Sequence, residues 1–188
     1  LDDRLLERTN AALMGRPTVM GERTPVTHGE GMKGMGVDIF IDLRNTSYTI
    51  TADVDVKANA NGVIVSQGGR FGGLSFYMKN GRPAFSYNYL GMQRSSVTAQ
   101  DPLPAGKASV RLEFAYDGGG MGKGGVGTLY VNDQQVGSGR IERTQAMVFS
   151  ADETADVGID GATPVVEDYR TPRGQFSGKI GKVTVSVH

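Results

Sequence analysis

The segment Ala108–Asp133 reads ASVRLEFAYD, then GGGMGKGGVG, then TLYVND, and it decides the fold. Apolar residues occupy every second position from Val110 to Tyr116 and the residues between them are largely polar, which is the pattern of a half-buried strand. The alternation resumes in Thr128–Val131, and Asn132-Asp133 then supplies a turn signal. We therefore expect two paired strands joined by a glycine-rich connection.

The glycine-rich connection superficially matches two phosphate-binding motifs. Gly120, Gly122 and Gly125 have the spacing G-x-G-x-x-G, but the dinucleotide motif must open a helix, and another strand follows here. A P-loop needs Ser or Thr after its Gly-Lys pair, whereas Gly124 follows Lys123. We therefore interpret the connection as a structural loop, in which glycine supplies positive φ values and close backbone approach.

The composition excludes several classes of function. The chain has 188 residues, which suits one large domain, and its 20 Lys and Arg balance its 20 Asp and Glu. Neither nucleic acid nor a membrane is an expected partner, because no net charge, dense basic run or spanning apolar stretch is present. There is no cysteine, which excludes thiol chemistry. Of the two histidines one is terminal, so a histidine triad or a multi-histidine metal site is not expected. Cytoplasm and periplasm both remain open as the compartment.

Two regions are expected along the chain. Leu1–Met14 is the one plausible helix, and Val19–Gly36 is rich in glycine and proline, so we expect residues 1–36 to be an irregular segment that packs on another domain. Its His28 is interpreted as a surface or packing residue and not as a ligand. The first residue is Leu1 and not Met, which suggests a processed or excised fragment. Residues 37–188 are expected to form a β-sandwich.

Short alternating runs separated by turn signals continue to the end of the chain, and Asn80-Gly81 is the strongest hairpin signal among them. This pattern predicts an all-β, antiparallel sandwich, and by analogy a jelly roll of the concanavalin A or laminin-G type. Besides the strands already named, the expected strands are Val37–Leu43, Tyr48–Val56, Val63–Gln67, Leu74–Met78, Phe85–Tyr89, Gln93–Thr98, Gln135–Ile141, Met147–Ser150, Asp156–Ile159 and Gln175–Val187.

Three groups of side chains were candidates for chemistry. Arg70 and Phe71 lie in the glycine-rich turn Gln67–Gly73, where the guanidinium either contacts an anion or partner or is simply solvated. The aromatic row Phe85–Tyr89 has the alternation of a sugar-stacking platform, but burial in the core is the favoured interpretation. The acidic run Asp152–Asp160 lacks EF-hand spacing, so a solvated rim is favoured over a Ca²⁺ site.

Short segments in order along most of the chain resemble the C-terminal region of bacterial arylsulfatases. They are Leu1-Asp-Asp-Arg4 with Glu7-Arg8, Ser47–Ala52, Gln67–Gly73, Pro102–Lys107, Tyr116–Gly120 with Gly122–Gly125, Gly139–Thr144, and Phe149-Ser150 with Asp152-Glu-Thr154 and Asp156-Val-Gly158. Sulfatases of this family use a formylglycine from a C/S-x-P-S-R motif, and that motif is absent here. The resemblance implies a non-catalytic tail domain whose partner is an N-terminal sulfatase domain, and it transfers no catalytic residue, metal or cofactor to this chain.

Three functions follow as hypotheses. The leading one is a non-catalytic arylsulfatase domain that contacts the sulfatase domain through its two glycine-rich loops, where Arg70 and Lys123 pair with carboxylates. The alternative is a lectin-like carbohydrate-binding module that uses loop aromatics and arginines. A stand-alone hydrolase is the third, and no carboxylate pair or triad can be assembled for it.

Overall fold

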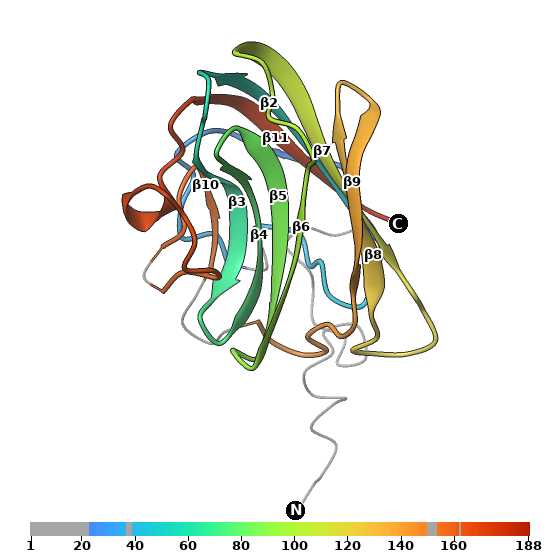
Figure 1. Cartoon of the computed structure of the whole chain (residues 1–188). Helices are drawn as coiled ribbons and strands as arrows, with labels where there is room; N and C mark the ends of the chain where they lie inside the picture. The colour runs from blue at the N-terminus through green and yellow to red at the C-terminus, as the bar shows by residue number, and fades with distance from the viewer. Residues whose placement is uncertain (1–22, 37–38, 150–153, 162) are drawn as a thin grey trace, which may run out of the picture.

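In the computed structural model, which describes residues 23–36, 39–149, 154–161 and 163–188, two antiparallel sheets pack face to face (Figure 1). The six-stranded sheet runs in spatial order β1 (Val26–His28), β11 (Lys179–Val187), β2 (Tyr48–Val56), β7 (Gly106–Tyr116), β8 (Gly125–Val131) and β9 (Gln134–Ile141). The five-stranded sheet runs β10 (Ala155–Val157), β3 (Gly62–Gly69), β4 (Gly72–Lys79), β5 (Arg82–Tyr89) and β6 (Gln93–Thr98). The predicted all-β sandwich is confirmed.

The segment Ala108–Asp133 supplies β7 and β8, which lie in the interior of the larger sheet. Strand β7 pairs with β8 along one edge, where Leu112 lies opposite Leu129. Along its other edge β7 pairs with β2, where Leu112 lies opposite Ile50. These three side chains are fully buried, because alternate residues of each strand point into the space between the sheets. The loop between β7 and β8 is the glycine-rich connection, and no helix follows it.

Helical structure within the described ranges is limited to one 3₁₀ turn, Pro172–Gly174. No helix in that part of the chain is long and apolar enough to cross a membrane. The expected helix Leu1–Met14 lies outside the described residues.

Two predicted strands are wrong where the structure describes them. The alternating residues 39–43 form a turn and irregular chain, and residues 147–149 are irregular as well. Phe40 and Leu43 are nevertheless buried in the core while Ile39 is exposed. The alternation therefore misjudged burial as well as pairing, because the adjacent residues Phe40 and Ile41 both lie in the core, in irregular chain that pairs with no neighbouring strand.

Part of the segment expected to be irregular belongs to the sandwich. Val26–His28 pairs with β11 at the edge of the larger sheet, and Met35 forms an isolated bridge with Ala155. His28 is buried and its ring stacks on Phe40 with centroids 5.0 Å apart, so it is a packing residue and not a surface one. A three-residue edge strand offers too short a pattern to be read from sequence.

The outer face of the five-stranded sheet is partly covered by residues 163–171, which we call the strap. Val165 and Val166 of the strap pack with Val63, Tyr77 and Ala84 in a second, smaller apolar cluster. Polar groups fix the strap as well: the hydroxyl of Tyr169 donates to the Asp160 carboxylate and forms a second hydrogen bond with Ser75 Oγ at 2.7 Å. The sheet is thus covered on one face by the core and over part of the other by the strap.

Candidate functional site

Two β-turns lie side by side at one end of the five-stranded sheet (Figure 1). Residues 69–72 connect β3 to β4, and residues 89–92 connect β5 to β6. The turns approach so closely that a Cβ on Gly91 would lie 3.0 Å from the carbonyl oxygen of Arg70. We call residues 69–72 and 89–92 together the hairpin tip.

One buried side chain holds the backbone of both turns. Asn88, with no exposed surface, donates through Nδ2 to the carbonyl oxygens of Gly69 and Arg70, both at 2.9 Å. Its Oδ1 accepts a hydrogen bond from the Gly91 amide at 2.9 Å, and its Nδ2 also lies 3.3 Å from the Val165 carbonyl of the strap. Because one amide bridges the two turns and the strap, the hairpin tip has a fixed backbone.

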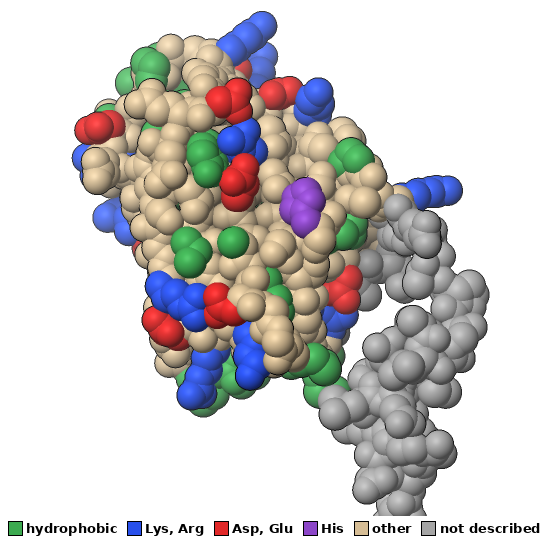
Figure 2. Space-filling model, turned by 90° about the vertical axis from the view of Figure 1, so that its right-hand side faces the viewer, with side chains coloured by type: hydrophobic (Ala, Val, Ile, Leu, Met, Phe, Trp, Pro, Cys, Tyr) green, Lys and Arg blue, Asp and Glu red, His purple; other side chains and the backbone are tan. Residues whose placement is uncertain are grey.

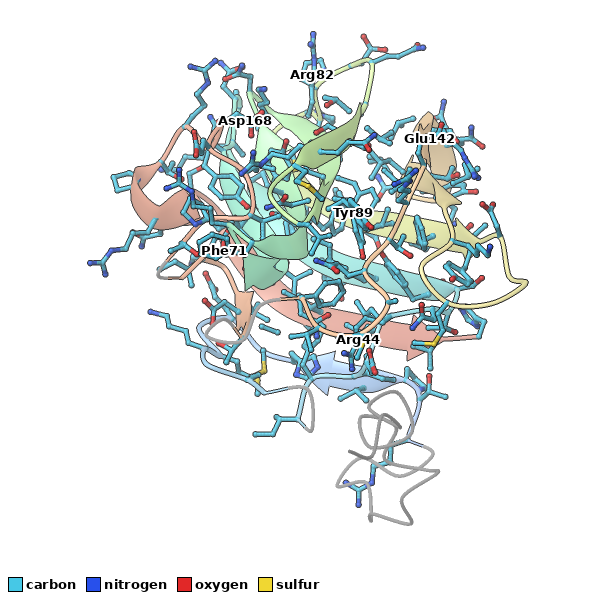
Figure 3. All side chains as sticks on the ribbon, turned by 90° about the horizontal axis from the view of Figure 1, so that it is seen from below. Arg44, Phe71, Arg82, Tyr89, Glu142 and Asp168 are labelled. Atoms are coloured by element: carbon cyan, nitrogen blue, oxygen red, sulfur yellow. The ribbon has the colours of Figure 1, made fainter. Side chains whose placement is uncertain are left out.

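The side chains of the hairpin tip are unusually apolar for a surface turn. Phe71, Leu90 and Met92 are 66%, 44% and 75% exposed. Tyr89 is half-buried beside them, and Figure 3 looks onto this end with Phe71 and Tyr89 on neighbouring hairpins. Figure 2 shows a different surface, on which hydrophobic side chains are scattered and acidic and basic ones are interspersed. The hairpin tip therefore differs in composition from that surface.

Arg70 and Phe71, predicted as contact residues, are adjacent on this turn. The Arg70 amide donates to Thr163 Oγ1 at 3.2 Å, which adds a second hydrogen bond between this turn and the strap. Its side chain is exposed, and within the described residues it forms no ion pair. A guanidinium on a fixed backbone is well suited to a bidentate contact with a carboxylate or sulfate.

Lys123, the third predicted contact residue, lies on a different loop. It belongs to residues 117–124 between β7 and β8, where the Tyr116 hydroxyl donates to the Gly120 carbonyl at 2.6 Å and accepts from the Lys123 amide at 2.8 Å. The Lys123 carbonyl accepts a hydrogen bond from Thr144 Oγ1 at 2.6 Å. The structure therefore brings Arg70 and Phe71 together and places Lys123 on a neighbouring, separately held loop.

Residues 142–149 connect this loop to the hairpin tip. The Gln145 amide donates to the Tyr87 hydroxyl at 2.7 Å, and a Cβ on Gly68 would lie 2.9 Å from Phe149 Cβ. The hairpin tip, residues 117–124 and residues 142–149 thus form one continuous end of the sandwich. We call this surface the loop end.

The charges of the loop end are unbalanced. Arg140, which lies beside this end, binds Asp117 in bidentate fashion at 2.7 and 2.6 Å, which lowers the pKa of that carboxyl, and its Nε lies 3.7 Å from Glu142 Oε2. In contrast, Arg70, Lys123 and Arg143 have no ion-pair partner in the part of the chain that is described. The described carboxylates of this end are therefore already paired, whereas three of its cations are not.

The acidic run near residue 156 does not form a solvated rim throughout, and that expectation is corrected here. Asp156 is buried and accepts a hydrogen bond from the Gly34 amide at 2.8 Å, while Asp160 is buried and accepts one from the Val165 amide at 2.8 Å. Both carboxylates stabilise local backbone, which the sequence spacing did not reveal. Asp152 and Glu153 lie outside the described residues.

A metal-binding cluster is absent from the described residues. No three side chains of His, Cys, Asp or Glu gather there as a metal site would need.

Of the aromatic row, Phe85 and Tyr87 are buried in the core as predicted. On the outer face, burial raises the pKa of Tyr77 to about 12, so its phenol remains protonated near neutral pH and acts as a hydrogen-bonding group.

Sequence reasoning missed the residues that make the hairpin tip distinctive. Asn88, Leu90 and Met92 were not singled out, although Leu90 and Met92 lie in the gap between two correctly predicted strands. The sequence pattern that could have identified them is a short turn in which a glycine stands between two large apolar residues. The role of Asn88 depends on partners that are distant in sequence.

Comparisons with known proteins bear on the fold. No family model and no curated protein sequence matches the chain. Among solved structures, it resembles the CBM40 module of the Ruminococcus gnavus IT-sialidase bound to α2,3-sialyllactose, with a TM-score of 0.55 and 16% identity over 90% of this chain and 92% of that one.

Two further solved structures are similar at the same level. The same module bound to α2,6-sialyllactose gives a TM-score of 0.53 at 15% identity, over 87% of this chain and 90% of that one. The LG1–3 region of the laminin α2 chain gives 0.53 at 12% identity, over 86% of this chain and 30% of that one. At these identities the similarity establishes the fold alone, and it confirms the predicted jelly-roll sandwich of the laminin-G type.

Proposed function

We propose that this chain is a non-catalytic recognition domain of the lectin-like β-sandwich class, which binds a glycan at the hairpin tip. The observation that carries the proposal is the turn held by Asn88, which presents an exposed arginine and an exposed phenylalanine, Arg70 and Phe71, on a fixed backbone. Support comes from the CBM40 module of the IT-sialidase, which has the same fold and whose two structures contain sialyllactose.

The chemistry of these residues suits an anionic sugar. An aromatic ring stacks on the apolar face of a pyranose, and a guanidinium binds a carboxylate or sulfate through two parallel hydrogen bonds. The loop sequences alone offered Phe71 as their single aromatic residue, but the fold adds half-buried Tyr89 and Tyr116 at the same end. This end of the sandwich therefore offers a sugar three aromatic rings and not one.

A glycan array followed by calorimetry tests this function. The purified chain should bind at least one acidic glycan, and Arg70→Ala and Phe71→Ala should each weaken binding about tenfold or more, as expected for the loss of about 1.4 kcal/mol. Arg82→Ala is the matched control, because Arg82 is exposed at the opposite end of the same sheet. Binding that is unchanged in both tip variants, or no binding to any glycan, would reject the proposal.

A second candidate, the non-catalytic C-terminal domain of an arylsulfatase, is favoured by a different observation. Most of the resembling segments that the structure describes have residues at the loop end. Ser47 Oγ accepts a hydrogen bond from the Tyr116 amide at 3.0 Å, Thr144 bonds to Lys123, and Phe149 packs at Gly68. The segment Pro102–Lys107 is an exception, because it packs near Gly81 at the other end.

This candidate makes two simple predictions. The purified chain should not release nitrophenol from an aryl sulfate above a denatured control, because it contains no formylglycine motif. The reading frame that encodes it should also contain a C/S-x-P-S-R motif upstream. Sulfatase activity in the chain, or a reading frame without that motif, would contradict the candidate.

A further inference from the structure

The apolar side chains of the hairpin tip form a row that extends over two turns. Neighbouring strands lie about 4.8 Å apart, so the four strands β3 to β6, which these turns connect in pairs, span about 14 Å. Phe71 lies on the first turn and Leu90 and Met92 lie on the second, and all three side chains are exposed. Phe71 alone would serve to stack on one sugar ring. The row is therefore longer than a single sugar requires.

Leu90 belongs to this row although its backbone conformation favours other residues. The turns Asn80-Gly81 and Asn132-Asp133 have positive φ at both residues, and Leu90-Gly91 shares this conformation with φ values of 55° and 70°. Asn, Asp and Gly tolerate the left-handed region, whereas leucine adopts it at a steric cost. Because Leu90 is 44% exposed, packing within the chain does not explain the choice. Strain at an exposed residue is typical of a site of contact with a ligand.

The hairpin tip continues into the two other loops of the loop end in a fixed order. A Cβ added to Gly72 of the tip would collide with the side-chain nitrogen of Gln145. On the other side, Thr144 Oγ1 donates to the Lys123 carbonyl at 2.6 Å. Residues 142–149 therefore lie between the hairpin tip and the loop that connects β7 to β8.

Each of these three loops carries one exposed cation. The three cations form no ion pair within the described ranges, and in the order of the loops they are Arg70, Arg143 and Lys123. Among the described carboxylates of these loops, those of Asp117 and Glu142 both face Arg140. Cations on three separate loops do not converge on one acidic group. They are complementary to a ligand that carries several acidic groups along its length.

We infer that the glycan bound at the loop end is an internal stretch of a linear acidic polysaccharide, with a carboxylate or sulfate on successive sugars. The inference rests on the proposed glycan-binding function and names the ligand class of the same site. One sugar stacks on Phe71 and pairs with Arg70, and the aliphatic side chains of the tip contact the apolar face of a neighbouring sugar. Acidic groups farther along the polysaccharide pair with Arg143 and Lys123.

Calorimetry with two series of oligosaccharides tests the inference. Heparin-derived oligosaccharides carry sulfates and carboxylates, and oligogalacturonates carry carboxylates alone, so the two series distinguish the acidic groups. In at least one series the octasaccharide should bind at least about tenfold more tightly than the disaccharide. This length advantage should shrink as the salt concentration rises, because salt screens exposed charges.

A pair of double variants locates the origin of the length advantage. Arg143→Ala with Lys123→Ala should remove most of the advantage, because the octasaccharide then loses two of its three cationic contacts. The matched control is Arg82→Ala with Lys107→Ala, which removes two exposed cations at the opposite end of the sandwich and should leave the advantage as it is in the native chain.

Several outcomes overturn the inference. They are equal affinity for short and long oligosaccharides, a length advantage that survives the loss of Arg143 and Lys123, and an equal loss in the control variant. Equal affinity for a single strand of DNA with the same charge would show attraction to any polyanion and would also contradict it. An array on which glycans with one acidic group bind, without a length advantage, would reject the inference and keep the proposed function. No binding to any glycan would reject both.

Discussion

Turns at the two ends of the five-stranded sheet both have positive φ at two successive residues, but they differ in what surrounds them. At the end remote from the hairpin tip, the Asn80-Gly81 turn is covered: the Gly81 amide donates to the Ala60 carbonyl at 2.8 Å and its carbonyl accepts from the Leu103 amide at 2.8 Å. Gly81 is buried, and the turn carries residues that its backbone favours. At the hairpin tip, Leu90 has the same backbone conformation but projects into water.

We interpret the Asn80-Gly81 turn as one that stabilises the fold and the Leu90-Gly91 turn as one that contacts a partner. Both turns close a hairpin of β5, so the sheet requires positive φ at each. Only the Asn80-Gly81 turn has the residue type that minimises the free energy of the isolated chain. The apolar side chains of the hairpin tip make sense if another molecule covers them, which is what both proposed functions require.

The largest expected effect is at the residue that holds the hairpin tip together. Asn88→Ala removes the donor to the buried Gly69 carbonyl and the acceptor of the Gly91 amide, whereas the Val165 carbonyl keeps its hydrogen bond from Arg94 Nε. Each group left without a partner costs about 1–3 kcal/mol, and truncating a fully buried side chain adds the cost of a cavity, so the free energy of unfolding should fall by about 3 kcal/mol or more. Urea denaturation measures this, with Asn80→Ala at the other end as the control. A loss below about 1 kcal/mol would show that the tip is not held as described.

Glycine substitutions at the two ends should differ in magnitude. Gly68 has φ +84°, and a Cβ there would lie 2.7 Å from Gly73 Cα and 2.9 Å from Phe149 Cβ. Gly81 has φ +76°, but its added Cβ would meet Pro102 Cβ at 3.2 Å. Gly68→Ala should therefore cost about 2–4 kcal/mol, combining strain and overpacking, and Gly81→Ala about 1 kcal/mol. Equal losses in urea denaturation would mean that both ends are equally tightly packed.

Sequence reasoning predicted the sheets better than their ends. Alternation located β7 and β8 because one side of each strand is buried, and Asn80-Gly81 identified its hairpin because glycine and asparagine supply positive φ. The same alternation misassigned residues 39–43, where Ile39 is exposed and its neighbour Phe40 is buried in irregular chain. Local patterns therefore locate most strands and turns but do not say which strands pair.

The candidate site was only partly predictable for the same reason. Arg70 and Phe71 were found because they stand between glycines in a short loop. Their adjacency to Leu90 and Met92 arises because β4 and β5 pair and bring two turns to one end, and that depends on strand register. Asn88 acts on Gly69 and Val165, which are 19 and 77 positions away, so no local pattern could reveal its role.

Acid should weaken the fold through a residue remote from the hairpin tip. Burial lowers the pKa of His28 below its ordinary 6.5, so the unfolded chain binds more protons than the folded one between the two values. The free energy of unfolding should be highest above about pH 7 and fall as the pH drops through 6.5. The loss is about 1.4 kcal/mol for each unit by which the pKa is lowered.

The variant His28→Gln checks the origin of this pH dependence. Because glutamine does not titrate, the difference in stability between about pH 8 and about pH 5 should shrink in the variant, whatever the variant's absolute stability. A slope identical to that of the native chain would assign the pH dependence to other groups. Urea denaturation of the variants at the two ends of the sheet should therefore be measured at a pH above the range in which His28 titrates.

The smallest expected effect is that of Leu90→Asn, which tests whether the Leu90 side chain destabilises the isolated chain. If Leu90 serves contact at the expense of stability, Leu90→Asn should raise the free energy of unfolding of the isolated chain by about 0.5–1 kcal/mol, because asparagine tolerates the left-handed backbone. The measurement is urea denaturation of the two proteins above the pH range in which His28 titrates. A stability that rises in Leu90→Asn agrees with the account, and a stability that falls by a similar amount would show that Leu90 supports the fold and contradict it.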